Sequence, residues 1–297
     1  MPQRPRQGMI ALMNQHRVMP TRVLPIFCAL MLCHSAPVRV YAEPTPAALS
    51  AFNRYASTVE ARLARQHLSR STFLAPPAST PQGELRLRQG EQVIEPVAEP
   101  VSENLTSSTR PALSPSQLPG AMLHHWRGTA FVPGAKAADL ERILRDFNAY
   151  PQRFSPEVLQ ARVLTQQGDR LQASMRVRQK HVLTVVMDTT YDIAFGRLDP
   201  QHGYSASRST QIREIDAHGT NQERALNASE EHGFLWQLNT YWSYEERADG
   251  LYIQIESVSL SRSIPTGLGW ALRPFVESVP RESLEFTLRS ASNAVRR

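Results

Sequence analysis

The chain has 297 residues, of which 41% are hydrophobic and 20% are charged. This composition supplies enough apolar side chains for a buried core, and it excludes a fully disordered chain, a collagen and a polytopic membrane protein. The length allows one large domain or two modest ones. The formal net charge is +6, but the first 42 residues hold five arginines and no acid. Without this segment 28 basic residues face 27 acidic ones, so no nucleic-acid partner is expected.

Residues 1–42 have the layout of a secretory signal peptide. Arg17 and Arg22 precede an apolar run over residues 23–32, and a small-residue stretch of the A-x-A type ends at Ala42. The run is shorter than the roughly 20 residues that a membrane-spanning helix needs. The pattern predicts cleavage after Ala42 and export to the periplasm or the medium. The alternative is an N-terminal anchor that stays uncut.

The same segment determines the cysteine content of the mature chain. Both cysteines, Cys28 and Cys33, lie within it. The mature chain therefore has no disulfide, no thiolate nucleophile and no cysteine metal site. The first 18 residues do not fit the usual basic region of a signal peptide, so either Met1 or Met19 is the start of the precursor.

The remaining chain divides by composition into residues 43–95, 96–119 and 120–297. Residues 46–68 are predicted to form a helix, because apolar residues recur at spacings of three and four: Leu49, Phe52, Tyr55, Val59 and Leu63. Residues 84–95 resemble a short hairpin with a turn at Gln89-Gly90. The segment 96–119 is rich in proline and serine, which predicts a linker.

The last segment is rich in strand-like stretches separated by turn signals. We predict strands over residues 124–131, 158–165, 170–178, 182–193, 204–215, 234–244 and 251–261. Period-2 alternation is clearest over residues 171–178 and 183–193, which indicates that one face of the sheet is apolar and buried and the other is polar and exposed to solvent. A helix is predicted over 137–147. Ser278 and Pro280 predict the start of a terminal helix that continues over residues 281–295.

This order of elements resembles the helix-grip fold of the START-like, or SRPBCC, superfamily, over about residues 120–293. Five stretches carry the resemblance: residues 124–128, 131–135, 239–242, 264–270 and 280–286. The resemblance implies an α+β fold in which a curved antiparallel sheet of about seven strands wraps around a long C-terminal helix. Two short helices would follow the first strand, and residues 43–95 would form an N-terminal extension. Relatives hold a sterol, phospholipid, quinone, polyketide or hormone between sheet and helix.

The resemblance implies that residues facing this space contact a hydrophobic ligand. The candidates are Met175, Met187, Tyr191, Arg208, Trp236, Trp242, Glu256, Trp270, Leu284 and Leu288. For the aromatic residues, ordinary core packing is the alternative. Trp270 follows a Gly-Leu-Gly stretch and lies either on a flap or in the core. Arg208 either protects an edge strand or points inward, where it would require an anionic partner such as Glu256.

Two further patterns bear on chemistry. His124 and His125 are adjacent on a strand and point to opposite faces, so they cannot chelate one metal ion together. Arg176, Arg178 and Lys180 form a basic row, which is either a solvated face or a docking strip for anionic lipid headgroups.

Three functions are compatible with this sequence. The first is a periplasmic or secreted protein that binds or transfers a hydrophobic small molecule, with no metal and no cofactor. The second is a cyclase- or aromatase-type enzyme in which Tyr191, Tyr241 or Glu256 moves protons. The third is an interaction protein without a ligand. No established catalytic motif is present, so the first hypothesis is preferred.

Overall fold

A nine-stranded antiparallel sheet forms the centre of the fold, in the order β1-β2-β9-β8-β6-β5-β4-β3 with β7 paired to β6. The computed structural model describes residues 43–98, 118–180, 184–263 and 269–296, and of residues 269–277 it describes the backbone alone. The strands are β1 Val93–Pro96, β2 Ala121–Pro133, β3 Val158–Gln167, β4 Arg170–Lys180, β5 Thr184–Asp199, β6 His202–Asp216, β7 Arg224–Ala225, β8 Gln237–Arg247 and β9 Gly250–Arg262. Each of the seven predicted strands is present, although β8 begins at Gln237 instead of residue 234, and residues 182–183 lie outside the described residues.

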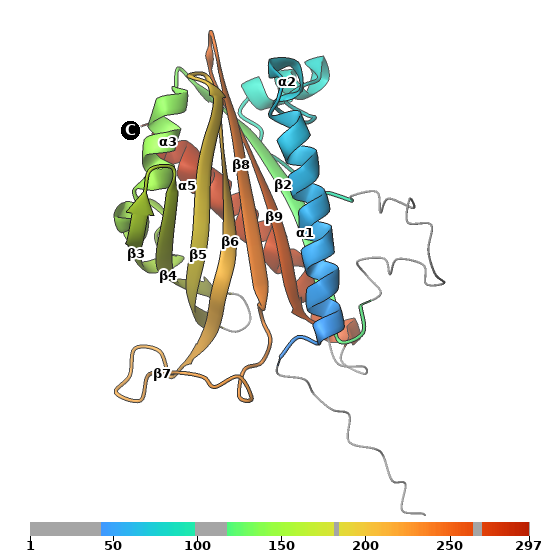
Figure 1. Ribbon diagram of the computed structural model, residues 1–297, viewed down its shortest axis with the longest axis vertical. Helices are drawn as coiled ribbons and strands as arrows, with labels where there is room; N and C mark the ends of the chain where they lie inside the picture. Colours follow the sequence, from blue (N-terminus) through green and yellow to red (C-terminus); the bar gives the residue numbers. More distant parts are fainter. Residues whose placement is uncertain (1–42, 99–117, 181–183, 264–268, 297) are drawn as a thin grey trace, which may run out of the picture. The chain divides into compact units, whose positions relative to one another are not determined.

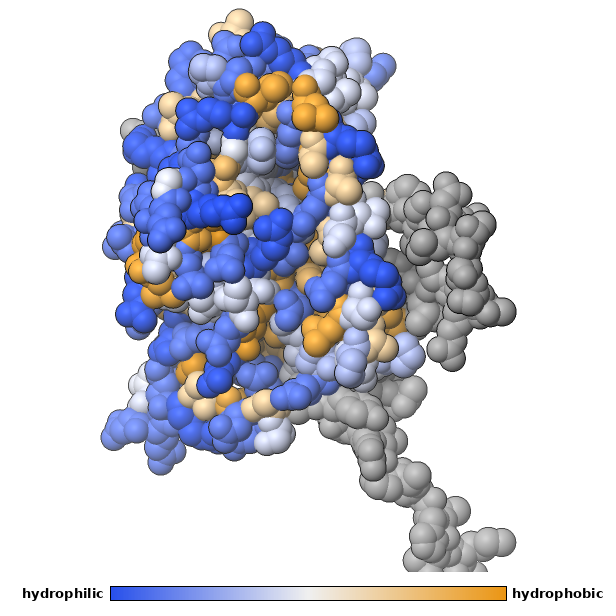
Figure 2. All heavy atoms as spheres, viewed as in Figure 1, coloured by the Kyte–Doolittle hydropathy of each residue, from blue (hydrophilic) through white to orange (hydrophobic). Residues whose placement is uncertain are grey.

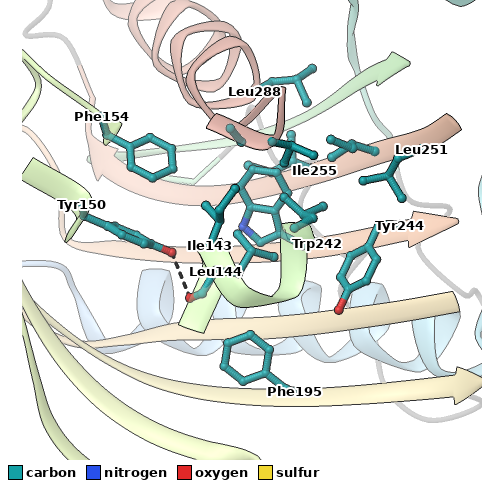
Figure 3. Close-up of a cluster of buried hydrophobic side chains, with 14 of the residues drawn as sticks. Ile143, Leu144, Tyr150, Phe154, Phe195, Trp242, Tyr244, Leu251, Ile255 and Leu288 are labelled. Carbon is teal, nitrogen blue, oxygen red and sulfur yellow. Dashed lines mark hydrogen bonds between the residues drawn. The ribbon is translucent and has the colours of Figure 1, made fainter. Parts of the chain in front are cut away.

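The long helix α5, Gly269–Val295, crosses one face of this sheet (Figure 1). We call that face the concave face and the opposite one the convex face. Leu284 and Leu288 of α5 pack there against Trp242 and Ile255 in one buried apolar cluster, which Figure 3 shows from within. A side chain at Gly128 would crowd this contact, because its Cβ would lie 3.1 Å from Leu288 Cδ2.

The terminal helix begins earlier than the sequence predicts. Ser278 and Pro280 lie inside α5 instead of at its start. A proline within a helix removes one backbone hydrogen bond but does not always end the helix. The proline signal therefore placed the start of the helix too late in the chain.

Three short helices, α3 Ala137–Arg145, η3 Phe147–Ala149 and α4 Tyr150–Arg153, connect β2 to β3. Leu140, Ile143 and Leu144 of α3 are buried in the same cluster as α5. Tyr150 Oη donates a hydrogen bond to the carbonyl oxygen of Leu144 at 3.0 Å, which Figure 3 marks. The connection thus closes one end of the space between sheet and α5.

The N-terminal helix α1, Pro46–Gln66, packs against the convex face. Its start follows from local chemistry, since Thr45 Oγ1 accepts a hydrogen bond from the backbone N–H of Ala48 and Pro46 occupies the first helical position. The predicted apolar stripe is buried against Tyr241, Val258 and Leu260. Figure 2, seen from the α1 side, shows a mostly hydrophilic surface with small separate apolar groups.

The segment after α1 corrects the predicted hairpin. After η1, Arg70–Thr72, residues 84–88 belong to helix α2, Pro81–Arg88, and β1 pairs with β2 instead of with residues 84–88. Thr80 caps α2 by accepting from the N–H of Gly83. Alternation misled the prediction, because Leu87 is buried whereas Leu85 is 59% exposed on the same short helix.

Candidate functional site

The candidate site is the concave face of the sheet together with α5. Six of the predicted ligand-binding residues lie there: Met175, Met187, Tyr191, Trp242, Leu284 and Leu288. They come from β4, β5, β8 and α5, so residues more than 100 positions apart meet at one place. The alternation over β4 and β5 predicted this correctly, because every second side chain of a strand faces the same way.

One part of the concave face is closed by packing. Trp242 is 7% exposed, Tyr191 4% and Leu288 0%, and Figure 3 shows Trp242 and Leu288 within the same cluster. Burial raises the pKa of the Tyr191 hydroxyl, although a hydrogen bond with Thr189 acts in the opposite direction. Tyr191 therefore remains protonated at neutral pH and is a poor general base.

A second part of the concave face stays partly exposed. Trp126, Leu238 and Met175 are only partly buried where they pack against the core cluster. Around them the face carries small hydroxyl side chains that are also partly exposed: Ser207, Thr240 and Ser257. This is the combination that pockets for hydrophobic molecules use, with an apolar lining and a few polar groups.

Glu256 does not face this space, which corrects its predicted role. It lies on the convex face beneath α1 and is 2% exposed. Its carboxylate accepts hydrogen bonds from Arg62 at 2.5 Å and Arg127 at 2.9 Å, and His125 Nε2 lies 2.9 Å away. Burial alone would raise the pKa of Glu256, but these partners outweigh it and lower the pKa from 4.5 to about 2. The carboxylate therefore joins α1 to the sheet.

Arg208 and Tyr241 are also on the convex face, contrary to their predicted roles. Arg208 Nε donates to Glu60 Oε1 of α1 at 2.6 Å, and the Arg208 side chain is 47% exposed. Tyr241 Oη donates to the same carboxylate oxygen at 3.0 Å. The predicted enzymatic set is thus divided between two faces, because Tyr191 lies on the concave face and Tyr241 and Glu256 on the convex one.

Trp236 belongs to the α1 cluster and not to the face that carries Trp242. It precedes β8, which begins at Gln237, so the alternation of the strand does not extend to it. Trp270 is at the start of α5, and its side chain lies outside the described residues.

One residue of the predicted basic row, Arg176, is neutralised by carboxylates. Arg176 donates to both carboxylate oxygens of Asp188, at 2.7 and 2.8 Å, and also pairs with Glu223. Arg178 donates to the carbonyl oxygen of Pro156 at 3.1 Å. A full positive charge at Arg176 is therefore not available to a lipid headgroup.

A cleft of about 270 Å³ lies where β4 ends beside α5. Gln179 and Glu157 line it from the sheet side, and Ser283 and Phe286 from the helix side. Burial raises the pKa of Glu157 from 4.5 to about 7, with Arg289 lowering it and Glu282 raising it. Sequence reasoning missed this cleft, because no motif links three segments that are so far apart in the chain.

His67 and Ser243 make a contact that superficially resembles a base and a nucleophile. His67 Nε2 lies 2.8 Å from Ser243 Oγ. Burial lowers the pKa of His67 from 6.5 to about 4, so the ring is neutral at pH 7. Ser243 is 3% exposed and His67 is 9% exposed, so a substrate has no access and the pair instead anchors the end of α1.

Within the described residues, no three His, Cys, Asp or Glu side chains gather closely enough to hold a metal ion. Among the helices of the described residues, none is long and apolar enough to cross a membrane.

The fold is the expected α+β helix grip, in which a long C-terminal helix crosses the concave face of an antiparallel sheet. Solved structures with a similar fold include a protein from Thermus thermophilus (14% identity, 57% of this chain and 95% of that chain, TM-score 0.42). A second is a STAR-related lipid transfer protein from Xanthomonas axonopodis (18% identity, 60% of this chain and 94% of that chain, TM-score 0.40). A third is the ZhuI aromatase/cyclase from a Streptomyces species (14% identity, 59% of this chain and 94% of that chain, TM-score 0.40).

No family model matches the chain, and no curated protein matches its sequence. At these identities the likeness to solved structures concerns the fold alone.

Proposed function

We propose that this protein binds a hydrophobic small molecule between the concave face and α5, and carries it outside the cytoplasm. The observation that supports this most directly is that Trp126, Leu238 and Met175 of the concave face stay partly exposed although they pack against the apolar core cluster. Each buried Å² of such area contributes about 25 cal/mol to binding. A ligand that covers this area therefore gains affinity without requiring a charged group.

Export is supported by the sequence of residues 1–42, which ends in a small-residue cleavage pattern at Ala42. A carrier in the periplasm would move an apolar molecule through water between membranes. Contact with an anionic membrane surface would depend on Arg178 and Lys180, because Arg176 is ion-paired.

Binding without turnover is favoured over an enzymatic function by the placement of the candidate acids and bases. Of the three, Tyr191 alone faces the proposed site, and its hydroxyl stays protonated. Tyr241 and Glu256 contact α1 and its neighbours instead.

The test is native mass spectrometry of the chain produced in a bacterial host with its own N-terminus, followed by organic extraction. We expect one apolar molecule per chain. The variant Thr240→Trp adds a large ring at a partly exposed concave-face position and should remove that molecule. The matched control Thr165→Trp, at an exposed position on β3, should retain it. A ligand-free mass for the unmodified chain, or retention in Thr240→Trp, would contradict the proposal.

A further inference from the structure

The cleft beside α5 is too small for a whole lipid-like molecule. Its volume is about 270 Å³, whereas pockets that enclose a drug-sized ligand measure about 300–1,000 Å³. It is large enough for one end of a ligand. The chemistry of its walls therefore indicates which kind of end it accepts.

The inner walls of the cleft offer hydrogen-bond acceptors that lack donors. Among the described residues, the Glu157 carboxyl group is affected by the charges of Arg289 and Glu282 but accepts no hydrogen bond. Gln179 donates its Nε2 hydrogen to Ser283 Oγ at 2.8 Å, and its Oε1 is buried with no donor in the described part of the chain. A buried acceptor without a donor is unfavourable, and a ligand that supplies the donor relieves this.

The positive charges of the cleft lie at its rim. Lys180 is exposed, and the Arg289 side chain is 56% exposed and lies 4.0 Å from Glu285. Charges at this level of exposure contribute little to binding because solvent screens them. Above pH 7, where the Glu157 carboxyl group is ionised, an anionic ligand end would meet this negative charge and the oxygen of Gln179 inside the cleft and be repelled.

The cleft adjoins the apolar part of the proposed site. Phe286 lines the cleft and packs against the core cluster. Gln179 lies on β4 in alternation with Val177 and Met175, so all three share the concave face. A molecule with one polar end could therefore place that end in the cleft and lay its apolar remainder along the sheet.

We propose that the ligand is an amphiphile whose polar end donates hydrogen bonds, as an alcohol or a primary amine does, and that Glu157 and Gln179 hold this end. This inference rests on the proposed function, since it requires an apolar ligand on the concave face. Amphiphiles with a carboxylate end are disfavoured by the same two acceptors.

The experiment compares three probes with one alkyl chain, 1-dodecanol, dodecylamine and dodecanoate, by isothermal titration calorimetry on the full chain. The titrations are run at about pH 8, where Glu157 is ionised, and below the aggregation concentrations of the probes. We expect the alcohol or the amine to bind at least about fivefold more tightly than dodecanoate, the effect of one net hydrogen bond. In Glu157→Gln the new amide N–H can donate to a carboxylate. The ratio between the affinity for the alcohol or amine and the affinity for dodecanoate should therefore fall by a similar factor. The control Glu91→Gln changes an exposed residue that does not line the cleft, and it should leave this affinity ratio unchanged.

Each outcome has a distinct meaning. Dodecanoate binding as tightly as the other probes, or a difference that Glu157→Gln leaves unchanged, would overturn the assignment of the cleft and leave the apolar site standing. Failure of all three probes to bind a folded chain would instead refute the proposed function itself. Circular dichroism of each variant shows whether it is folded.

Discussion

Replacing Glu256 with glutamine removes the charge that joins α1 to the convex face. The side chain is 2% exposed, and Arg62, His125 and Arg127 surround it. Its pKa falls from 4.5 to about 2 in the folded chain, which corresponds to about 3 kcal/mol of stability at neutral pH. Breaking a buried ion pair by removing one partner costs a similar amount, about 3–5 kcal/mol. We expect Glu256→Gln to lower the free energy of unfolding by about 3 kcal/mol.

The pH dependence gives this prediction its sign. Because the pKa of Glu256 is lower in the folded state, its stabilisation is complete above the unfolded value of 4.5 and is lost as the pH falls toward 2. In urea unfolding, the difference between the unmodified chain and Glu256→Gln should fall to less than half between pH 7 and about pH 3. Glu91→Gln, which removes an exposed pair with Arg86, should show no measurable change. A difference that does not vary with pH, or one below about 1 kcal/mol at pH 7, would refute the reasoning.

Three further outcomes are expected. Leu288→Ala should lower the free energy of unfolding by about 2–5 kcal/mol in urea, since Leu288 is 0% exposed in the core; a neutral result would contradict the packing of α5. Arg208→Ala should retain the co-purifying ligand in native mass spectrometry, because Arg208 pairs with Glu60 on the convex face; loss of the ligand would return Arg208 to the site. The Glu157 carboxyl group should titrate near pH 7 in carbon-detected NMR, higher in Arg289→Gln and lower in Glu282→Gln; a midpoint that neither change moves would reject the cleft geometry.

Local patterns were sufficient to predict most of the sheet. The alternation over residues 171–178 and 183–193 predicts which side chains face the core, and the structure places Met175 and Tyr191 on the same face. The stripe over residues 46–68 likewise predicted α1. Prediction failed where a short helical segment alternates like a strand. Over residues 84–88, Leu85 and Leu87 have the spacing of a strand face, but the segment belongs to helix α2, whose start is capped by Thr80.

The amino-acid sequence by itself determined most of the elements and the separation of polar from apolar faces, because these depend on neighbours within a few residues. Only the tertiary structure decided which partner covers each face. α1 occupies the convex face and takes Arg208, Tyr241 and Glu256 as its partners, whereas α5 covers the concave face. The cleft at Glu157 likewise exists only in the folded chain. Contacts between distant segments depend on register and crossing geometry, which no local pattern contains.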